Sequence, residues 1–446
     1  MTKTKKASVI WLVFLICFFV GRLILFGDEL PSSSSDQLTL KEAIKRVLTN
    51  NASVKKTTEA ISILTARVGG SRSNLWPKLQ TVGNYTRLGP VPELTIPKMG
   101  TFKFYPANNF DLHLAAHQLL FDNHRTREAI NLSQAQVTEA LDRLEVLKRD
   151  LSFGTAELFY SILYLKESLR VKTEHLQTLH KHLEAAEKKL EAGTATELDL
   201  LNIKVRMAST ENIIADLKNN LEKQELRLKQ LMGQVDNKPL ELAGSFATEK
   251  IKLDEETLIQ EALKQRMEMK TVEDQIKIAS LGLDFASLHN KPSVSLNLMG
   301  GLKNGFIPNL NTMKFNFAAA LEVDVPIFDG HLTQALKAEA EANLRVSRSQ
   351  QQEVEDMIKT EVLEALSDLK SSEQKLNLVE VNLQQAKKAL DYARSHYEAG
   401  TITNLDLMDT EDAYTEAEFI RLQAIYQFTL SLLSLQKAVG REVLAD

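Results

Sequence analysis

The sequence predicts a mainly α-helical chain with transmembrane β-strands, built from two tandem halves. EAGTATELDLL at 191–201 returns almost unchanged as EAGTITNLDLM at 398–408, and Phe121-Asp122 returns as Phe328-Asp329 at the same offset. Each half also joins a long heptad-patterned stretch to short segments of alternating polarity. A repeat with one fixed offset indicates a duplicated unit. Each half is therefore expected to supply one long antiparallel coiled-coil hairpin and two strands.

Composition supports long, solvent-exposed helices. The chain has 446 residues, of which 25% are charged and only 6% aromatic, which is unusual for compact mixed domains. A net charge of −5 argues against a nucleic-acid partner. The single cysteine, Cys17, lies in an N-terminal apolar run, so the rest of the chain has no thiol for a disulfide, a metal site or a nucleophile.

The N-terminus is predicted to be a signal peptide over residues 1–35. A lysine-rich start precedes an apolar run over 7–20 and a Ser-rich polar segment, the order found in secretory signals. An uncleaved anchor is the alternative, while lipidation at Cys17 is disfavoured because Ile16 precedes it. Beyond the signal, no stretch approaches the roughly 20 apolar residues of a spanning helix. The first repeat is then expected over 36–245 and the second over 246–446.

Heptads predict two very long helices. Leucines recur every seventh position with apolar residues between them and only Lys172 off the pattern, and the predicted helices run without a break over about 124–191 and 331–398. Sustained heptads indicate a coiled coil, and each helix would be on the order of 100 Å long.

Glycines end both helices, at tips near 193 and 400. Gly193 and Gly400 lie just past the last heptad positions, Leu190 and Tyr397, where the left-handed conformation closes a helix. Thr196-x-x-Asp199 and Thr403-x-x-Asp406 resemble capping boxes that open the return helices. Each half is therefore expected to contain a coiled-coil hairpin.

Four segments are predicted to be membrane-spanning strands, as pairs at about 77–121 and 292–328. Apolar and polar residues alternate in each over about ten positions, as in strands with one lipid face and one lumen face. A soluble hairpin on a core is the alternative. Because four strands cannot close a barrel and open edges are not tolerated in lipid, the chain is expected to supply part of a larger barrel.

The motifs at these junctions resemble those of TolC-type outer membrane efflux proteins. They are PIFDG at 326–330, its counterpart QLLFD at 118–122, the paired tips, and LMGQ and AVGR where the halves end. The resemblance covers the whole mature chain. It implies a homotrimer in which four strands per chain form a 12-stranded outer-membrane β-barrel, and the helices continue it as an α-barrel tunnel through the periplasm of a Gram-negative bacterium.

The same resemblance implies a passive exit duct of a tripartite efflux pump or type I secretion system. A periplasmic adaptor and an inner-membrane pump of RND, ABC or MFS type would open it at the periplasmic tip. Cargo is left open. A periplasmic adaptor (membrane fusion) protein and a membrane-anchored structural coiled coil are the alternative functions, although adaptors normally carry one hairpin.

Site residues follow from the resemblance. Family members line the closed entrance with acidic residues of the second hairpin, which match Asp406 and Asp409; the first-half counterparts are Asp199 and Asn202. Asp406 also has a simpler explanation as a helix cap. Residues expected to lock the gate or contact the adaptor are Gly193, Thr194, Asp199, Asn202, Tyr397, Gly400 and Thr401. Where some relatives have arginine, this chain has Ile402.

No enzyme, cofactor or metal site is expected. Catalytic motifs such as a P-loop, G-x-S-x-G or H-E-x-x-H are absent from the sequence. His113 and His117 share a strand face without a third ligand in view, so they are interpreted as lumen-facing polar residues. His180 and His182, two positions apart on a helix, do not face each other.

Overall fold

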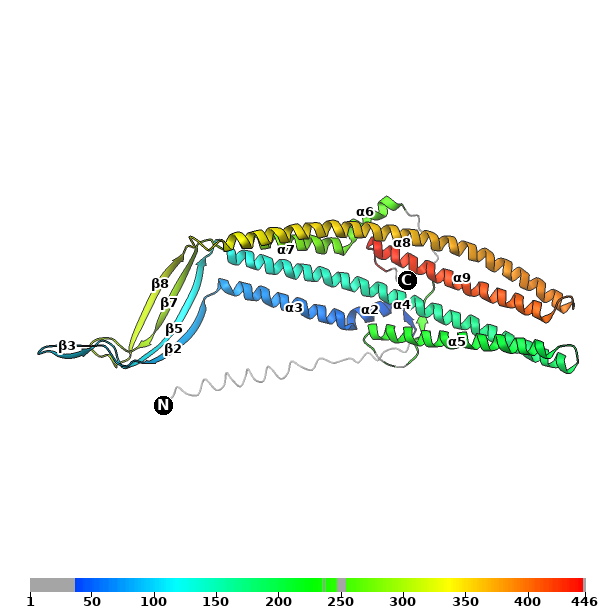
Figure 1. The fold of residues 1–446 in the computed structure, drawn as a ribbon, viewed down its shortest axis with the longest axis horizontal. Coiled ribbons are helices and arrows are strands. Elements are labelled where there is room, and N and C mark those ends of the chain that lie inside the picture. Colours follow the sequence, from blue (N-terminus) through cyan, green and yellow to red (C-terminus); the bar gives the residue numbers. More distant parts are fainter. Residues whose placement is uncertain (1–36, 235, 237, 247–253, 444–446) are drawn as a thin grey trace, which may run out of the picture.

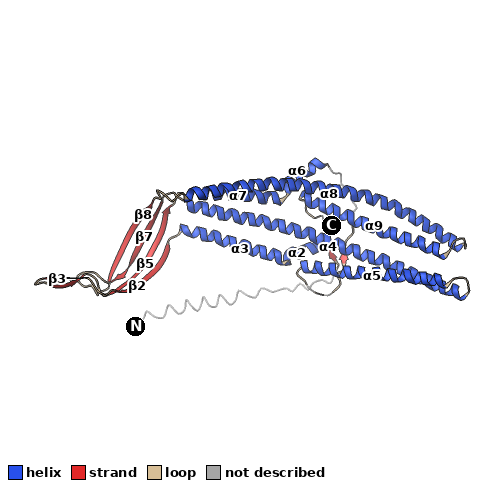
Figure 2. Cartoon of the chain, viewed as in Figure 1, coloured by secondary structure: helices blue, strands red, loops and turns tan. Residues whose placement is uncertain are grey.

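The computed structural model describes residues 37–234, 236, 238–246 and 254–443. The predicted signal peptide, 1–35, lies outside these residues. Helices make up one long body, and the long strands β2, β5, β7 and β8 lie at one end of it (Figures 1 and 2).

The first half contains β1 (Leu38–Thr39), α2 (Leu40–Asn50), α3 (Ala52–Arg72), η1 (Ser73–Leu75), β2 (Lys78–Arg87), β3 (Glu93–Ile96), β4 (Gly100–Lys103), β5 (Asn108–Phe121), α4 (Arg125–Glu191) and α5 (Glu197–Leu231). The second half contains β6 (Leu242–Ala243), α6 (Glu255–Gln265), α7 (Met267–Ser287), β7 (Ser293–Lys303), β8 (Lys314–Asp324), α8 (Leu332–Glu398) and α9 (Asn404–Val439).

The two long helices are confirmed, with 67 residues in each of α4 and α8. We call α4 and α5 hairpin 1, and α8 and α9 hairpin 2. Both turn back at the end of the body opposite the strands (Figure 1). No helix in the described part of the chain is both long enough and apolar enough to cross a membrane.

In each half, a short helix is separated by a break in the backbone from a longer one, α2 from α3 and α6 from α7. The backbone is extended at Asn51, between α2 and α3, and at Arg266, between α6 and α7. Glycines that end the hairpins pack against these breaks: a Cβ on Gly233 would lie 3.1 Å from the Asn50 carbonyl, and one on Gly440 would lie 3.2 Å from Arg266 N. Both glycines have positive φ, a conformation that favours glycine. In this way α3 extends the line of α5, and α7 that of α9 (Figure 1).

The four long strands form one antiparallel sheet in the order β2-β5-β7-β8. Each strand joins a helix: α3 leads through η1 into β2, β5 into α4, α7 into β7 and β8 into α8. The helices contact one another in the matching order, with α4 against α3 and α5 on one side and against α7 and α9 on the other, and α8 beyond them. The helical layer therefore continues the sheet.

Alternation in the strands is confirmed, because cross-strand register places the apolar residues on one face. Leu114 pairs with Thr81 and Gly300, while its neighbour Ala115 pairs with Gln80 and Met299. The large apolar side chains on the face of the sheet that carries Leu114 are exposed. They are Leu79, Tyr85, Phe110, Leu112, Leu114, Leu298, Leu302, Phe315, Phe317, Leu321 and Val323.

Two details of the strand region differ from expectation. The alternating pattern continues to Ile327, but β8 ends at Asp324, because the Asp329 carboxylate accepts from Thr333 N (2.9 Å) and starts helix α8. The turn-rich sequence LGPVPELTIPKMG at 88–100 predicts a loop between the first two strands, yet it contributes β3 to a small hairpin with β4, where the Thr95 and Thr101 hydroxyls lie 3.0 Å apart. That hairpin forms the end of the molecule farthest from the helical tips (Figure 1).

The middle of the body holds two apolar cores, one in each half. In the first half, α2 packs on α4 and the end of α5 around Val47, Phe153 and Leu228. In the second half, α6 and α7 pack on α8 and α9 around Ala262, Val362 and Phe428. Strands β1 and β6 pair in parallel beside the first core. The resemblance to TolC-type proteins implies a belt around the tunnel at this level, formed by residues 233–252 and the terminal segments, of which 235, 237 and 247–252 lie outside the described part of the chain.

Candidate functional site

Both helical tips have the same local structure. Gly193 and Gly400 take φ of 73° and 71°, and the next residue donates its N–H back into the helix, from Thr194 to Lys189 O (2.8 Å) and from Thr401 to His396 O (2.9 Å). Each of these two threonine hydroxyls donates to the same carbonyl as its own N–H. This is a Schellman-type closure, which satisfies the last carbonyls of a helix. The tips are therefore rigidly defined turns.

Asp199 and Asp406 occupy equivalent capping boxes. Asp406 Oδ2 accepts from the Thr403 hydroxyl (2.6 Å) and Thr403 N (2.9 Å), and its own N–H donates to Thr403 Oγ1 (3.2 Å). Asp199 does the same with Thr196. These hydrogen bonds hold the pKa of both carboxyls below the ordinary value. Each aspartate is thus ionised and oriented by its own helix end.

Asp409, one turn beyond Asp406, contacts the other hairpin. Its Oδ1 lies 2.5 Å from Arg206 Nη2 of α5, and 58% of its side chain remains exposed. The first-half counterpart, Asn202, is half-buried on α5. The structure therefore gives Asp409 a partner in hairpin 1, whereas Asp406 is bound within hairpin 2.

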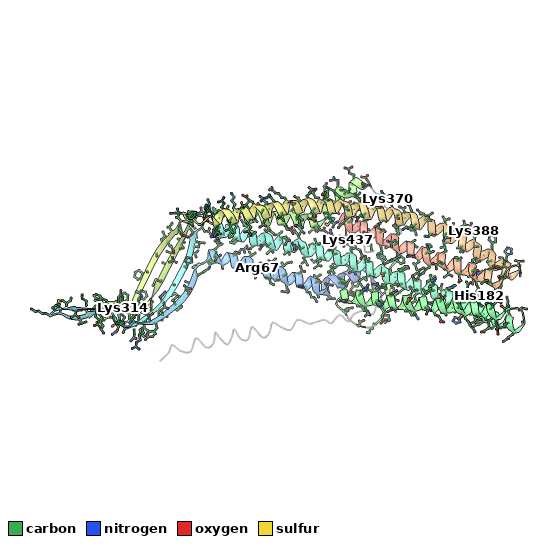
Figure 3. The ribbon with its side chains drawn as sticks, in the orientation of Figure 1. Arg67, His182, Lys314, Lys370, Lys388 and Lys437 are labelled. Carbon is green, nitrogen blue, oxygen red and sulfur yellow. The ribbon has the colours of Figure 1, made fainter. Side chains whose placement is uncertain are left out.

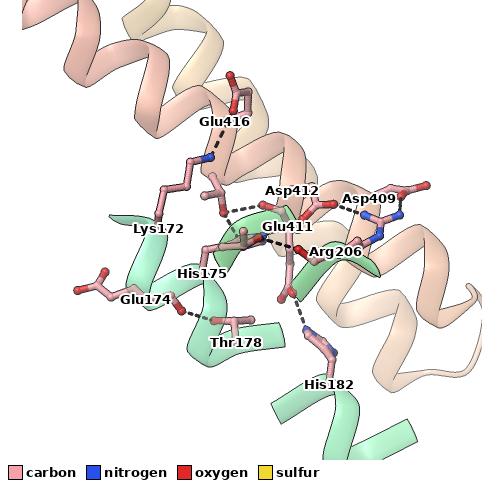
Figure 4. Close-up of polar contacts among 12 residues, drawn as sticks. Lys172, Glu174, His175, Thr178, His182, Arg206, Asp409, Glu411, Asp412 and Glu416 are labelled. Atoms are coloured by element: carbon pink, nitrogen blue, oxygen red, sulfur yellow. Dashed lines mark hydrogen bonds and ion pairs between the residues drawn. The ribbon is translucent and has the colours of Figure 1, made fainter. Parts of the chain in front are cut away.

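Arg206 also pairs with Asp412 through its other guanidinium nitrogen. Asp412 in turn lies 3.1 Å from His175 Nε2 of α4. One arginine and one histidine of hairpin 1 thus hold two carboxylates of α9 (Figure 4). Such charge-assisted bonds are the stronger class of hydrogen bond.

A second group of contacts runs beside the first. His182 Nε2 lies 2.6 Å from Glu411 Oε2, and Arg394 Nη2 lies 3.3 Å from Glu411 Oε1. Lys172 Nζ lies 3.5 Å from Glu416 and 5.0 Å from the centre of the Phe419 ring. Lys172 interrupts the heptad pattern of α4 in the sequence, and its place in this contact explains why a lysine stands there.

Burial acts to raise the pKa of Glu411 and Asp412, but their partners outweigh it. His182 and Arg394 lower the pKa of Glu411 below its ordinary value. His175 and Arg206 do the same for Asp412. Both carboxylates are therefore ionised at neutral pH; Asp412 is compensated by hairpin 1 alone, and Glu411 by His182 of hairpin 1 together with Arg394 of hairpin 2.

Tyr397 also joins the two hairpins. Its hydroxyl accepts a hydrogen bond from Lys189 Nζ (2.5 Å), and that ammonium lies 4.5 Å from the centre of the tyrosine ring. Ile402, where some relatives carry arginine, packs inside hairpin 2 near Leu390 and Leu407. The tie at this tip thus uses lysine and tyrosine.

Sequence reasoning found no partner for His182 and missed His175, Arg206 and Asp412. His175 and His182 are one heptad apart on α4, and Asp409, Asp412 and Glu416 follow helical spacing on α9. Two facing stripes of opposite charge were a usable signal. They were missed because the helices that carry them belong to different repeats.

His113 and His117 form separate contacts on the polar face of the sheet. His113 Nδ1 lies 3.0 Å from Asp111, and His117 Nδ1 lies 2.7 Å from Asn297. Among the described residues, no three histidine, cysteine or acidic side chains come together in a way that could hold a metal ion.

Comparisons with known proteins agree with this architecture. A family model described as outer membrane efflux protein matches residues 43–234 and 258–441. Outer membrane protein TolC of Vibrio cholerae is 22% identical over 321 residues, covering 70% of this chain and 72% of TolC. Outer membrane efflux protein BepC of Brucella suis is 18% identical over 420 residues, covering 94% of this chain and 89% of BepC.

The CmeC outer membrane channel of Campylobacter jejuni has the same fold, with a TM-score of 0.76 at 17% identity over 90% of this chain and 85% of CmeC. A match in both halves favours the channel over a periplasmic adaptor or an anchored coiled coil. The chain therefore belongs to the outer membrane efflux protein family, TolC-type channels of the Gram-negative outer membrane that act as exit ducts of efflux systems and not as enzymes.

Proposed function

We propose that the tips of hairpins 1 and 2 form the periplasmic gate of this exit duct, and that docking of an adaptor and an inner-membrane pump opens it. One observation carries the proposal: Arg206 of hairpin 1 holds Asp409 and Asp412 of hairpin 2 near the free end of the helical body. A contact between hairpins at that place controls whether they separate.

Family membership implies trimeric assembly within an efflux system. In the described part of the chain, β2 and β8 each pair with a single strand, which leaves two open sheet edges. Exposed apolar side chains also follow the two outer helices, Leu198, Leu201 and Val205 on α5 and Leu378, Val381 and Tyr392 on α8. A homotrimer joins these edges and covers these side chains, since unpaired edges are not tolerated in lipid.

The two repeats, 36–245 and 246–446, are proposed to be the moving units below the belt. Near the tips each hairpin has its own apolar cluster, around Leu179 and Ile203 in hairpin 1 and around Leu390 and Leu407 in hairpin 2. Of hairpin 2, only Met408 is among the buried residues of the hairpin 1 cluster. Each hairpin can therefore move without breaking its own core.

Asp406 and Asp409 are proposed to line the constriction. In a trimer they make two stacked rings of three carboxylates, because positions three apart lie on nearly the same helix face. Arg206 neutralises part of the Asp409 ring in this arrangement, while the capping box fixes the direction of Asp406. Such rings attract multivalent cations and favour cation passage.

The partners are proposed to be a periplasmic adaptor and a pump of RND, ABC or MFS type, in an efflux or type I secretion system. The tip turns, with Gly193 and Thr194 on one side and Gly400 and Thr401 on the other, are the natural docking points because they project farthest from the membrane end (Figure 1). Tyr397 lies beside them, bound to Lys189.

Planar-bilayer recordings of the purified channel test the gate. Asp406→Asn combined with Asp409→Asn is expected to weaken cation selectivity and to relieve block by a trivalent cation added on the periplasmic side. Asp199→Asn is the matched control, because Asp199 has the same capping box without a place in the rings. Full selectivity and full block in the double variant would show that both aspartates only cap and cover the helix surface.

A further inference from the structure

In the contact between the hairpins near the tips, basic side chains lie on one hairpin and acidic side chains on the other. We call it the lower seam. Hairpin 1 supplies only basic groups to it and α9 only acidic ones; they are Lys172, His175, His182 and Arg206 facing Asp409, Glu411, Asp412 and Glu416. His182 lies in the tip half of the body (Figure 3). The seam is thus held by ionic contacts, two of which depend on histidine.

Higher up, the same interface is apolar. Tyr164 of α4 stacks on Tyr426 of α9 with ring centres 4.7 Å apart, and Tyr164 also contacts Phe419 at 6.3 Å. Leu433 of α9 is buried in the core of the first half. The interface therefore has an apolar upper part and a mainly polar lower part, in which Met408 of α9 is the buried apolar residue that enters the hairpin 1 cluster.

Both ring nitrogens of His175 face oxygen atoms in this arrangement. Its Nε2 faces a carboxylate oxygen of Asp412 at 3.1 Å, and a carboxylate only accepts. Its Nδ1 faces Thr415 Oγ1 at 3.2 Å, while that hydroxyl donates to the Glu411 carbonyl at 2.9 Å. When that hydroxyl hydrogen points to the carbonyl, both ring nitrogens can donate only in the imidazolium form, and that form satisfies every one of these partners.

His182 also contacts a carboxylate of α9. Its Nε2 donates to Glu411 Oε2 at 2.6 Å, and the other oxygen of that carboxylate accepts from Arg394 of α8. The His182 and Glu411 side chains are both largely buried, with 15% and 10% exposed. A charge on His182 compensates the buried carboxylate, and losing it weakens the pair.

We propose that the lower seam is a pH-operated latch: protonated His175 and His182 hold hairpin 2 against hairpin 1, and loss of their protons releases it. This inference rests on the proposed gate at the tips. Because the closed arrangement binds more protons than the open one, acid favours closing and rising pH favours opening.

The latch histidines face charged groups from every packed element. On α9, Asp412 contacts His175 and Glu411 contacts His182. These carboxylates are contacted in turn by Arg206 of α5, which pairs with Asp412, and by Arg394 of α8, which pairs with Glu411. Both arginines keep their charge through the pH range of imidazole. The carboxylates are already ionised there, with their pKa held low. Imidazole is the side-chain type in this set whose ordinary pKa lies between about pH 5.5 and 8.

The full-length trimer in planar bilayers tests the latch. Raising the periplasmic pH from about 5.5 to about 8 is expected to raise the ratio of open to closed channels about tenfold, equivalent to ~1.4 kcal/mol. His175→Gln with His182→Gln should abolish this dependence. His180→Gln is the matched control, because His180 is exposed on the same helix, and it should keep it.

A distance measurement gives a second readout. Spin labels on Ala185→Cys of α4 and Ala413→Cys of α9, both exposed, should separate as pH rises in the wild-type background and stay apart in the double histidine variant. Unchanged pH dependence after removal of both histidines would overturn the latch. A wild-type channel whose opening does not depend on pH would also overturn the latch. If the selectivity of that channel still responds to Asp406→Asn with Asp409→Asn, the proposed gate would remain supported.

Discussion

Arg206 on α5 and Asp409 on α9 form an ion pair with Nη2 and Oδ1 2.5 Å apart, although they belong to different repeats. The same guanidinium binds Asp412, and 25% of the Arg206 side chain is exposed. A planar guanidinium that spans two carboxylates cannot be replaced by a single point charge. This one side chain therefore carries much of the connection between the two tips.

Arg206→Gln is expected to loosen the tips and to expose the full charge of Asp409. Loss of these partly screened pairs should cost about 1–2 kcal/mol, so channel conductance and cation selectivity should both rise in bilayer recordings. Arg227→Gln is the control, since Arg227 is exposed on the same helix. A channel with wild-type conductance after Arg206→Gln would place the closing contact elsewhere.

Adjacent residues on β8 should respond oppositely to a new charge. Phe317 belongs to the apolar face and is 78% exposed, while Ala318 points to the polar face and pairs with Met299. Phe317→Arg should cost about 2–4 kcal/mol if it faces lipid near the midplane, and it should lower the yield of heat-modifiable trimer in the outer-membrane fraction. Ala318→Arg should assemble normally. Equal loss in both variants would contradict the assignment of faces.

Two neighbouring glycines on β7 offer a sharper contrast. A Cβ on Gly301 would lie 2.1 Å from the Leu112 carbonyl oxygen, a backbone atom that has no freedom to move away, whereas one on Gly300 would meet only the Phe315 and Phe317 side chains at 3.8 Å or more. Gly301→Ala should therefore disrupt the pairing of β5 and β7 and reduce assembled trimer. Gly300→Ala should leave trimer yield near the wild-type level. Normal assembly of Gly301→Ala would mean that β7 shifts its register.

Much of the fold could be predicted because its signals are local. Heptads define α4 and α8 to within one residue, and alternation defines β2, β5 and β7 nearly as well. Prediction failed where a neighbour in space decides the structure. The alternation continues past Asp324, where the start of α8 ends the strand, and the β3 and β4 segments are too short to show a period.

The candidate site could be predicted only in part. The tip glycines and capping boxes follow from short motifs, because a Schellman turn and a capped helix depend on a few consecutive residues. The partner of Asp409 does not, since Arg206 lies in the other repeat. His175 and His182 are ordinary polar positions of a coiled coil until α9 is placed against them.

Asp274 on α7 and Asp142 on α4 form a carboxyl pair in the body, and the last prediction concerns its protonation. Lys270 binds one oxygen of Asp142 at 2.9 Å, while Asp142 Oδ2 and Asp274 Oδ2 are buried without a hydrogen-bond partner in the described structure. Burial, and then the contact with Asp142, raise the pKa of Asp274 to about 6. A group with a raised acid pKa binds more protons when folded, so its contribution to stability is present below about pH 4 and is lost as pH rises through about 6.

Asp274→Asn should therefore stabilise the trimer at neutral pH. The amide keeps the shape, removes the charge repulsion and can donate to Asp142, for a gain of about 1–2 kcal/mol at about pH 7 that disappears near pH 4. Thermal unfolding followed by far-UV circular dichroism at both pH values measures the change. Asp284→Asn, at an exposed position of the same helix, should shift the melting temperature little at either pH. A lower melting temperature for Asp274→Asn at neutral pH would mean that the charged pair is itself stabilised, for example by a bound cation.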